Sequence, residues 1–327
     1  MISTKAWKTV QTALIVVAIA GGIRLAAIYG GCLTGHCRIS ADAYDDKMAT
    51  LEKTDPKLVQ YTEGRRIPTG LGVTRGIAVG KDGAIYVAGD SGVRVFHADG
   101  SHIKDIRLTG ETYALSIGAK GMVYAALKDH LEVVDQKGRL TAKWSSPNRK
   151  AYFTSISVSG KDIWVGDSGN RNVLRYNTSG IVTGIFAAKD SEKRAPGLIL
   201  PSPHLHVQAA PGGSVWVSDP GRHQLELYGP DAHLKRAWGN ESFQIQGFSG
   251  CCNPISFAIP PSGGFVTAEK GLPRVKVYRS DGSFDCVVAG REAFSPDVVG
   301  LDVTVDTHGR ILVLDPTSRS IRVFVHK

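Results

Sequence analysis

The sequence predicts an all-β protein built from several small sheets, on three observations. A stretch of about fourteen residues recurs, in which two apolar runs typical of strands flank a turn rich in Asp, Gly and Arg. The copies lie about 40 to 50 residues apart, which is the repeat length of small antiparallel sheets. The chain also holds 38 glycines, many of them in the short turns between apolar runs.

The recurring hairpin is clearest in VWVSDPGRHQLELY at residues 215–228. Three further copies share its apolar positions and its closing aromatic residue: IWVGDSGNRNVLRY (163–176), FVTAEKGLPRVKVY (265–278) and ILVLDPTSRSIRVF (311–324). Two weaker copies have a shorter turn: IYVAGDSGVRVF (85–96) and VYAALKDHLEVV (123–134). Since the repeated region shows strand-turn-strand units and no 3.6-residue periodicity, it predicts a six-bladed β-propeller at residues 58–327.

The first part of the chain predicts a membrane anchor. Residues 1–9 carry two lysines and precede an apolar stretch at 10–31, which as a helix rising about 1.5 Å per residue spans a bilayer core of about 30 Å. The lysines favour a cytoplasmic N-terminus and an exported propeller, periplasmic or extracellular, although Arg24 near the far end weakens this orientation. A cleaved signal peptide and a lipid anchor on Cys32 are the alternatives, and both also export the propeller.

Residues 32–57 are polar and differ from the repeats, so we interpret them as a tether. They hold Cys32 and Cys37, which flank His36. A metal or redox pair is one interpretation, but we favour a local disulfide or two free thiols, because a tether offers no rigid frame for coordination.

The two ends of the repeated region predict how the ring closes. The last copy ends at Lys327, after only the third strand of a four-stranded blade, which would expose a sheet edge. The segment 58–67, LVQYTEGRRI, has the apolar and β-branched residues of a strand. We therefore expect it to supply the fourth strand of the last blade.

The repeats resemble the NHL-repeat family of β-propellers. The resemblance covers residues 58–327 and depends on GIAVG at 76–80, on the steps WVGD and WVSD, and on the strands RNVLRY and RSIRVF. It implies a propeller architecture. Some members are lyases that hold zinc with channel histidines, and related six-bladed lactonase-like propellers hold calcium with acidic and Asn residues, for which Asn253 and Asp302 alone are weak candidates.

Strand alternation predicts which rim of the propeller carries function. The loops before each inner strand share one rim with the turns between the second and third strands, whereas the opposite rim receives only short Gly turns. The first rim collects most of the charged repeat residues: Asp167, Arg171, Asp219, Arg222, His223, Glu269, Lys270, Arg274, Asp315 and Arg319. We interpret the repeated acidic residue mainly as structural, accepting N–H groups of its own turn and pairing with Arg171 or Arg319 four residues later.

One loop on this rim suggests a metal site. Alignment of the repeats places FSGCCNPISF (248–257) opposite PSPHLH (201–206), with Ser256 opposite His206. His204 and His206 point to one side of a strand, so with Cys251 and Cys252 they offer N and S ligands for zinc or copper. A vicinal disulfide or two packed thiols explains the adjacent cysteines equally well, and Cys286 is expected in the core.

Composition and motifs limit the function. The net charge of +9 comes without a basic run or interleaved aromatic residues, so a nucleic-acid partner is disfavoured. No nucleophile elbow, metalloprotease motif or phosphate loop is present. We expect a binding or scaffold module whose partner is another membrane or periplasmic protein. This function is favoured over that of an enzyme. The alternative is a metal-dependent enzyme or redox accessory that uses His204, His206, Cys251 and Cys252.

Overall fold

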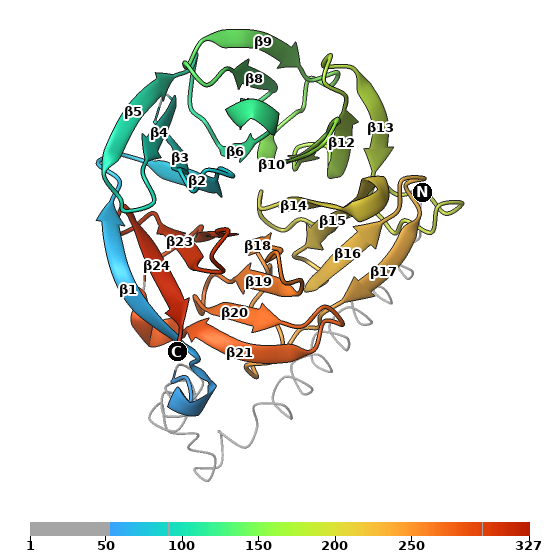
Figure 1. Cartoon of the computed structure of the whole chain (residues 1–327). Coiled ribbons are helices and arrows are strands. Elements are labelled where there is room, and N and C mark those ends of the chain that lie inside the picture. The colour runs from blue at the N-terminus through green and yellow to red at the C-terminus, as the bar shows by residue number, and fades with distance from the viewer. Residues whose placement is uncertain (1–52, 91, 296) are drawn as a thin grey trace, which may run out of the picture. The chain divides into compact units, whose positions relative to one another are not determined.

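The computed structural model describes residues 53–90, 92–295 and 297–327, which form six four-stranded antiparallel sheets arranged in a ring (Figure 1). The first three blades contain β2 (Thr74–Val79), β3 (Ile85–Gly89), β4 (Gly92–Phe96), β5 (His102–Arg107), β6 (Ala114–Ile117), β7 (Val123–Ala126), β8 (His130–Val134), β9 (Leu140–Ser145), β10 (Phe153–Ser159), β11 (Asp162–Asp167), β12 (Asn172–Tyr176) and β13 (Val182–Phe186). The six-bladed all-β propeller predicted from the repeats is confirmed.

The other three blades complete the ring. They contain β14 (Val207–Ala210), β15 (Ser214–Asp219), β16 (Gln224–Tyr228), β17 (Leu234–Trp238), β18 (Ser256–Ala258), β19 (Phe265–Ala268), β20 (Val275–Tyr278), β21 (Phe284–Ala289), β22 (Asp302–Val305), β23 (Ile311–Asp315), β24 (Ser320–His326) and β1 (Tyr61–Pro68). The described residues also form four single-turn 3-10 helices, which lie between strands or before them: η2 (Pro56–Leu58), η3 (Ala119–Gly121), η4 (Pro211–Gly213) and η5 (Arg291–Ala293).

The last blade is closed by the N-terminal side of the repeated region. β1 pairs antiparallel with β24 from Tyr61 opposite His326 to Pro68 opposite Ser320, with one irregularity near Gly64. The blue β1 and the red β24 lie side by side in Figure 1. The closing strand expected at 58–67 therefore exists, and it covers the backbone N–H and C=O groups that β24 would otherwise expose.

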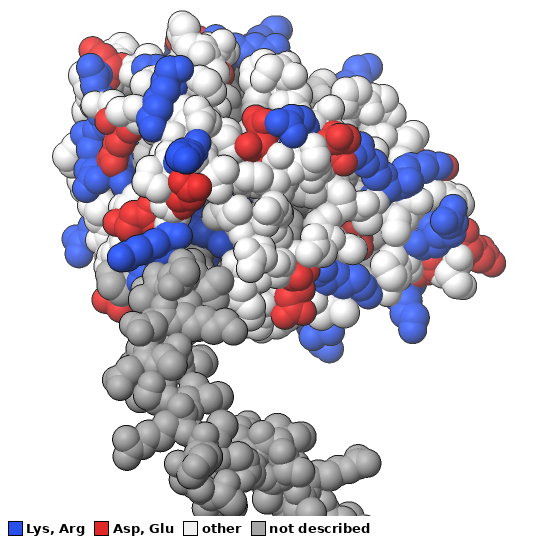
Figure 2. All heavy atoms as spheres, turned by 90° about the horizontal axis from the view of Figure 1, so that it is seen from below, with Lys and Arg blue, Asp and Glu red and all other residues white. Residues whose placement is uncertain are grey.

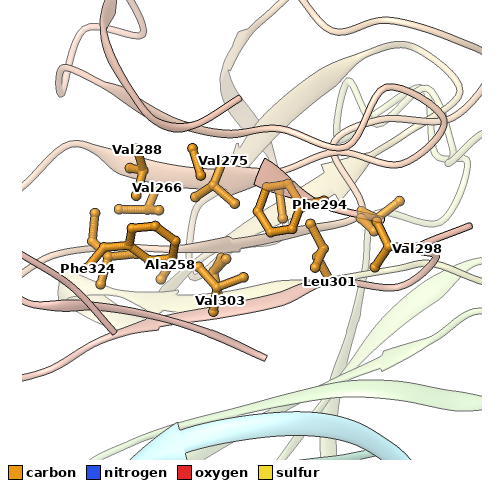
Figure 3. Close-up of a cluster of buried hydrophobic side chains, with 14 residues drawn as sticks. Ala258, Val266, Val275, Val288, Phe294, Val298, Leu301, Val303 and Phe324 are labelled. Carbon is orange, nitrogen blue, oxygen red and sulfur yellow. The ribbon is translucent and has the colours of Figure 1, made fainter. Parts of the chain in front are cut away.

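The core lies between neighbouring blades. Each of the six buried apolar clusters among the described residues combines side chains from two adjacent sheets. In the cluster of Figure 3, Ala258 and Val266 of the fifth blade pack with Val303 and Phe324 of the sixth. The middle strands of a blade are buried on both faces, which explains why they read as continuous apolar runs in the sequence.

Polar side chains on the inner strands also connect neighbouring blades. In four junctions the side chain of one inner strand accepts the backbone N–H of the next: Ser116 from Val158 (3.1 Å), Ser157 from Ala209 (2.9 Å), Ser256 from Val303 (3.3 Å) and Asp302 from Ile77 (2.9 Å). Three of these acceptors are serines. The fourth is a carboxylate, and it lies at the junction where the ring closes.

The membrane anchor predicted at residues 10–31 lies outside the described residues, as do its flanks 1–9 and most of the tether. Within the described part of the chain, no helical segment has the length and hydropathy of a membrane span. Figure 2 shows basic and acidic side chains interspersed over the described surface in view.

One buried cation links the two strands that close the last blade. Arg322 of β24 is almost fully buried and donates to both carboxylate oxygens of Glu63 on β1, at 3.0 Å and 2.5 Å. Burial opposes ionisation of Glu63, but the hydrogen bonds from Arg322 and Arg66 outweigh it, so the pKa of Glu63 is lowered. Arg66 is a partner of the same carboxylate, and its side chain is half exposed.

We predict that Glu63→Gln lowers the free energy of unfolding by about 1–2 kcal/mol, because Arg322 stays buried without its counter-charge. Arg66→Ala, which removes the exposed partner of the same carboxylate, should cost less than about 0.5 kcal/mol. Urea unfolding of both variants measures the difference. Equal effects of the two substitutions would contradict the role assigned to the Arg322–Glu63 pair.

Candidate functional site at the mouth of the central channel

A cavity of about 330 Å³ lies on the rim where the leading loops, the loops that precede each inner strand, come together. Residues from all six blades line it: Thr74, Arg75, Tyr113, Ala114, Tyr152, Thr154, Pro203, His204, His206, Ile255, Ser256, Val299, Gly300, Leu301, Asp302 and Pro316. It is therefore a feature of the closed ring and belongs to no single blade. Its position matches the rim on which strand alternation placed function.

Six equivalent residues surround the channel at this level. They are the inner-strand positions opposite the fourth residue of each recurring hairpin: Gly76, Ala114, Ser155, His206, Ser256 and Asp302. The first three blades supply small side chains. The last three supply an imidazole, a hydroxyl and a carboxylate, so the ionisable side chains of this set lie in one half of the ring.

Asp302 is the centre of this polar half. Its Oδ1 accepts from the Ser256 hydroxyl at 2.5 Å and from the Val303 N–H at 3.0 Å, and its Oδ2 accepts from the Ile77 N–H at 2.9 Å. The Nε2 of His206 lies 3.5 Å from Oδ1. One carboxylate thus contacts groups from the first, fourth and fifth blades as well as its own.

His206 is held with one nitrogen toward Asp302 and one without a partner. Its ring packs edge-on against Phe257 at a centroid distance of 5.2 Å. Its Nδ1 is buried and has no hydrogen-bond partner among the described residues. One ring nitrogen thus faces a carboxylate, and the other is enclosed without a partner among the described residues.

The opposite side of the cavity is aromatic and cationic. The Arg75 guanidinium lies 4.6 Å from the centre of the Tyr113 ring and is 3.0 Å from Glu111. Tyr113 meets Tyr152 edge-on. Burial, with hydrogen bonding to Tyr152 and Glu111, raises the pKa of Tyr113 to about 12, so its hydroxyl stays protonated. The Nε of Arg75 is buried with no partner among the described residues, and can donate to an acceptor.

His204 lies in the loop that lines the fourth blade's side of the cavity. Burial lowers its pKa to about 4, and the nearby Lys270 adds to this shift. The imidazole is therefore neutral at neutral pH. The sequence prediction that His204 and His206 share one side of the chain agrees with their both lining the cavity.

The repeated acidic residues make structural contacts, but more of these contacts go to the leading loops than the sequence analysis expected, which placed them in each residue's own turn. Asp167, Asp219, Glu269 and Asp315 are almost fully buried. The first three accept backbone N–H groups of the leading loop of their own blade: Tyr152 (3.0 Å), Ile199 (3.1 Å) and Ser249 (2.9 Å). They hold the loops that form the cavity wall. Asp315 instead accepts the amides of Thr317 and Ser318 in its own turn.

The predicted pairing of these carboxylates with Arg171 and Arg319 is wrong. Neither arginine forms an ion pair with its Asp in the described structure. Both occupy left-handed backbone positions, with φ of 53° and 49°, at the end of a tight turn. Asp167 bonds the side chain of Asn170 instead, and Asp315 faces Arg322 at 3.9 Å. Arg222, one position earlier in its turn, does bond Asp219.

Other predicted rim residues are held in internal contacts. His223, at φ 58°, donates from Nε2 to the Gly250 carbonyl at 2.6 Å. Arg274 and the fully buried Lys276 both pair with Glu269, at 2.8 Å and 2.7 Å. None of the ten charged residues proposed for the rim lines the cavity. A direct role for them in binding stays a prediction.

The four candidate metal ligands do not form one site. No group of three or more His, Cys, Asp or Glu side chains within the described ranges is arranged to hold a metal ion. The histidines face the cavity, whereas Cys251 is exposed and Cys252 is buried, with their sulfurs 3.1 Å apart. Zinc or copper shared by His204, His206, Cys251 and Cys252 therefore lacks the required convergence. Cys286 is buried in β21, as expected.

Arg75 could not be assigned to the site from the sequence, and Asp302 was given only as a weak candidate ligand. The alignment that sets Ser256 opposite His206 also sets Asp302 at the same position of the last repeat. The sequence therefore contained a signal for the group formed by His206, Ser256 and Asp302. Arg75 has no equivalent pattern in the other repeats, and only the ring geometry brings it to the cavity.

The fold and the site define a six-bladed β-propeller with a polar cavity at its channel mouth. No protein-family profile matches the chain, and no curated protein matches it in sequence. Among solved structures, it is similar to a protein of unknown function from Bacteroides thetaiotaomicron, with a TM-score of 0.58 and 15% identity over 79% of this chain and 70% of that chain.

Two lyase structures are also similar to it. Streptogramin B lyase has a TM-score of 0.58 and 8% identity, over 82% of this chain and 98% of that chain. Virginiamycin B lyase from Staphylococcus aureus has a TM-score of 0.55 and 10% identity, over 82% of this chain and 100% of that chain. At these identities the likeness establishes the fold alone.

We predict that acid destabilises the cavity wall through His204. Its pKa is about 4 in the folded chain and about 6.5 when unfolded, so between these values the unfolded state binds more protons and stability falls as pH falls. With partial exposure allowed for, the loss is roughly 2 kcal/mol. Urea unfolding at about pH 7.5 and about pH 4.5 measures it.

The comparison uses two variants. His204→Gln should lose less stability on acidification than the parent, whereas His97→Gln, at an exposed position, should behave like the parent. A parent and a His204→Gln variant with the same pH dependence would contradict the assignment.

Proposed function

We propose that this chain is a membrane-anchored, exported propeller that binds a small, partly apolar molecule in the cavity at the mouth of its channel. The observation that carries the proposal is the polar arc of His206, Ser256 and Asp302. The equivalent positions of the first three blades hold Gly, Ala and Ser, whereas here a hydroxyl donates to a carboxylate that faces an imidazole, and the imidazole has a buried nitrogen without a partner among the described residues.

The side chains that line the cavity indicate which ligand groups would fit it. The Arg75 guanidinium, which lines the cavity, suits an acceptor such as a carboxylate or carbonyl oxygen. The His206 imidazole, which also lines it, suits a hydroxyl or N–H group. Val299, Leu301 and Pro203 supply apolar wall. A hydroxy or amino acid derivative with an apolar portion meets all three requirements.

Exposed apolar residues in the leading loops support a binding role for the same rim. Val73, Ile199, Phe243 and Val299 are exposed, and each lies in the leading loop of a different blade; Val299 also lines the cavity. Apolar side chains exposed on a rim that carries a polar cavity favour a binding surface there. They would cover the apolar portion of a ligand that extends out of the cavity, or contact a membrane or periplasmic protein that carries it.

Export and anchoring are supported by the N-terminal sequence. Residues 10–31 have the length and apolar character of a membrane span, and the preceding lysines favour a cytoplasmic start. Membership of the NHL-repeat family is supported by the repeat motifs and is part of this proposal.

An enzyme is the second candidate. The geometry of His206, oriented by Asp302 with Nδ1 free, is that of a general base that takes a proton from a bound substrate. Ser256 donates to Asp302 and not to His206, so the three residues do not form a nucleophile relay. A metal-dependent enzyme would need ligands beyond the four residues first considered.

Ligand-observed NMR on the purified full-length chain, with a set of small hydroxy and amino acids, tests the proposal. We expect compounds that bind the parent to lose affinity by roughly five- to thirtyfold in His206→Ala, because each lost hydrogen bond to the ligand costs about 1–2 kcal/mol. The control is His308→Ala, an exposed histidine that is absent from the cavity lining.

Binding that persists unchanged in His206→Ala would place the ligand elsewhere and contradict the proposal. Time-resolved spectra of the same mixtures distinguish the second candidate, since an enzyme converts the bound compound and a binding module leaves it intact.

A further inference from the structure

Two adjacent thiols lie on the same rim, beside the cavity but outside it. Cys251 is exposed and Cys252 is buried, at 2% exposure, with their sulfurs 3.1 Å apart. Neither lines the cavity, and neither is used by the proposed function. Successive side chains of an extended chain point apart. Two sulfurs at this distance therefore indicate that the backbone at Cys251 and Cys252 is not extended.

The backbone around the two cysteines is firmly held. The Ser249 N–H donates to Glu269 at 2.9 Å. The buried Asn253 donates from its amide to the carbonyls of Ser249 (2.5 Å) and Lys270 (3.0 Å), and accepts the Lys270 N–H at 2.9 Å. The backbone is therefore held on both sides of the pair by hydrogen bonds to Glu269 and Lys270, which directly follow β19.

The surroundings favour a thiolate on the inner cysteine. The Lys270 ammonium donates to the Ser202 hydroxyl at 2.9 Å beside this pair. Burial opposes ionisation of Cys252, but hydrogen bonds from Ser202, Cys251 and Lys270 outweigh it and lower its pKa. Hydrogen bonding to Cys252 and its charge raise the pKa of Cys251. The inner sulfur is the more readily ionised, and the outer sulfur is the accessible one.

We propose that Cys251 and Cys252 form a thiol–disulfide exchange site, in which Cys251 meets an external disulfide and Cys252 resolves the product. The observation behind it is the pairing of an exposed and a buried sulfur at 3.1 Å beside Lys270. The reactant class is a disulfide, either a small molecule or that of a thiol oxidoreductase.

The exchange takes place in two steps. The Cys251 sulfur attacks an external disulfide R–S–S–R, forms a bond to one sulfur and expels R–S⁻, which takes the proton that Cys251 gives up. The Cys252 thiolate then attacks the Cys251 sulfur, closes the vicinal disulfide and expels the second R–S⁻, which takes the proton lost by Cys252. Two protein thiols are oxidised, and one external disulfide is reduced to two thiols.

Peptide mapping of the full-length chain tests this site without any ligand in the cavity. The reduced protein is exposed to glutathione disulfide, free thiols are alkylated and the chain is cut with trypsin. Cleavage after Arg236 and Lys270 releases residues 237–270, which contain both cysteines of the pair and no other. We expect this peptide two hydrogens lighter than its reduced form, without bound glutathione, and restored by dithiothreitol.

The single variants separate the two roles. Cys252→Ser should retain one glutathione on Cys251, because the resolving sulfur is gone, and Cys251→Ser should gain none, because Cys252 is buried. The buried Cys286, in its own tryptic peptide, is the internal control and should stay reduced.

Two results would overturn the proposal: a parent peptide that keeps glutathione, or one that stays fully reduced while Cys251 alkylates readily in the folded chain. If a Ser variant fails to fold, binding of a trivalent arsenical to the parent decides the matter, since a close thiol pair gives a one-to-one adduct on residues 237–270 and separated thiols do not. Failure here would leave the proposed ligand-binding function untouched, because Cys251 and Cys252 lie outside the cavity.

Discussion

The carboxylate of Asp302 is the contact on which the functional end of this propeller depends. It accepts the Ile77 N–H from the first blade and the Ser256 hydroxyl from the fifth, and it faces His206 of the fourth. Other junctions use serine hydroxyls for the same purpose. A carboxylate accepts more hydrogen bonds than a hydroxyl and orients an imidazole as well. The junction that closes the ring is thereby also the polar wall of the cavity.

This arrangement requires the blades to hold their relative positions. Apolar clusters between neighbouring sheets form the core, and β1 completes the last sheet so that it has four strands like the others. The repeated acidic residues then fix the leading loops on this frame. Asp167, Asp219 and Glu269 act on loop amides and not on a ligand. The structural contacts thus recur among the blades, whereas the polar residues of the cavity lie where a repeat departs from the others.

Much of the fold could be predicted because it follows from patterns among residues close together in the sequence. Hairpin periodicity gave the blade number, and the unfinished last repeat located the closing strand. The alignment of His206 with Ser256 anticipated part of the polar arc. Arg171 and Arg319 were misassigned because their partner depends on a left-handed turn position, which no apolar pattern reports. The proximity of Arg75 and Asp302 to one cavity depends on ring closure between distant segments, which local patterns do not reveal.

The most direct test of this account is hydrogen exchange on Asp302→Ala, with Ser157→Ala as the matched change at another junction. Loss of the carboxylate should speed exchange of the Ile77 and Val303 amides and leave those of the second and third blades unchanged, whereas Ser157→Ala should speed exchange at Ala209 alone. Unchanged exchange at Ile77 in Asp302→Ala would contradict the claim that this carboxylate ties the closing junction to the site.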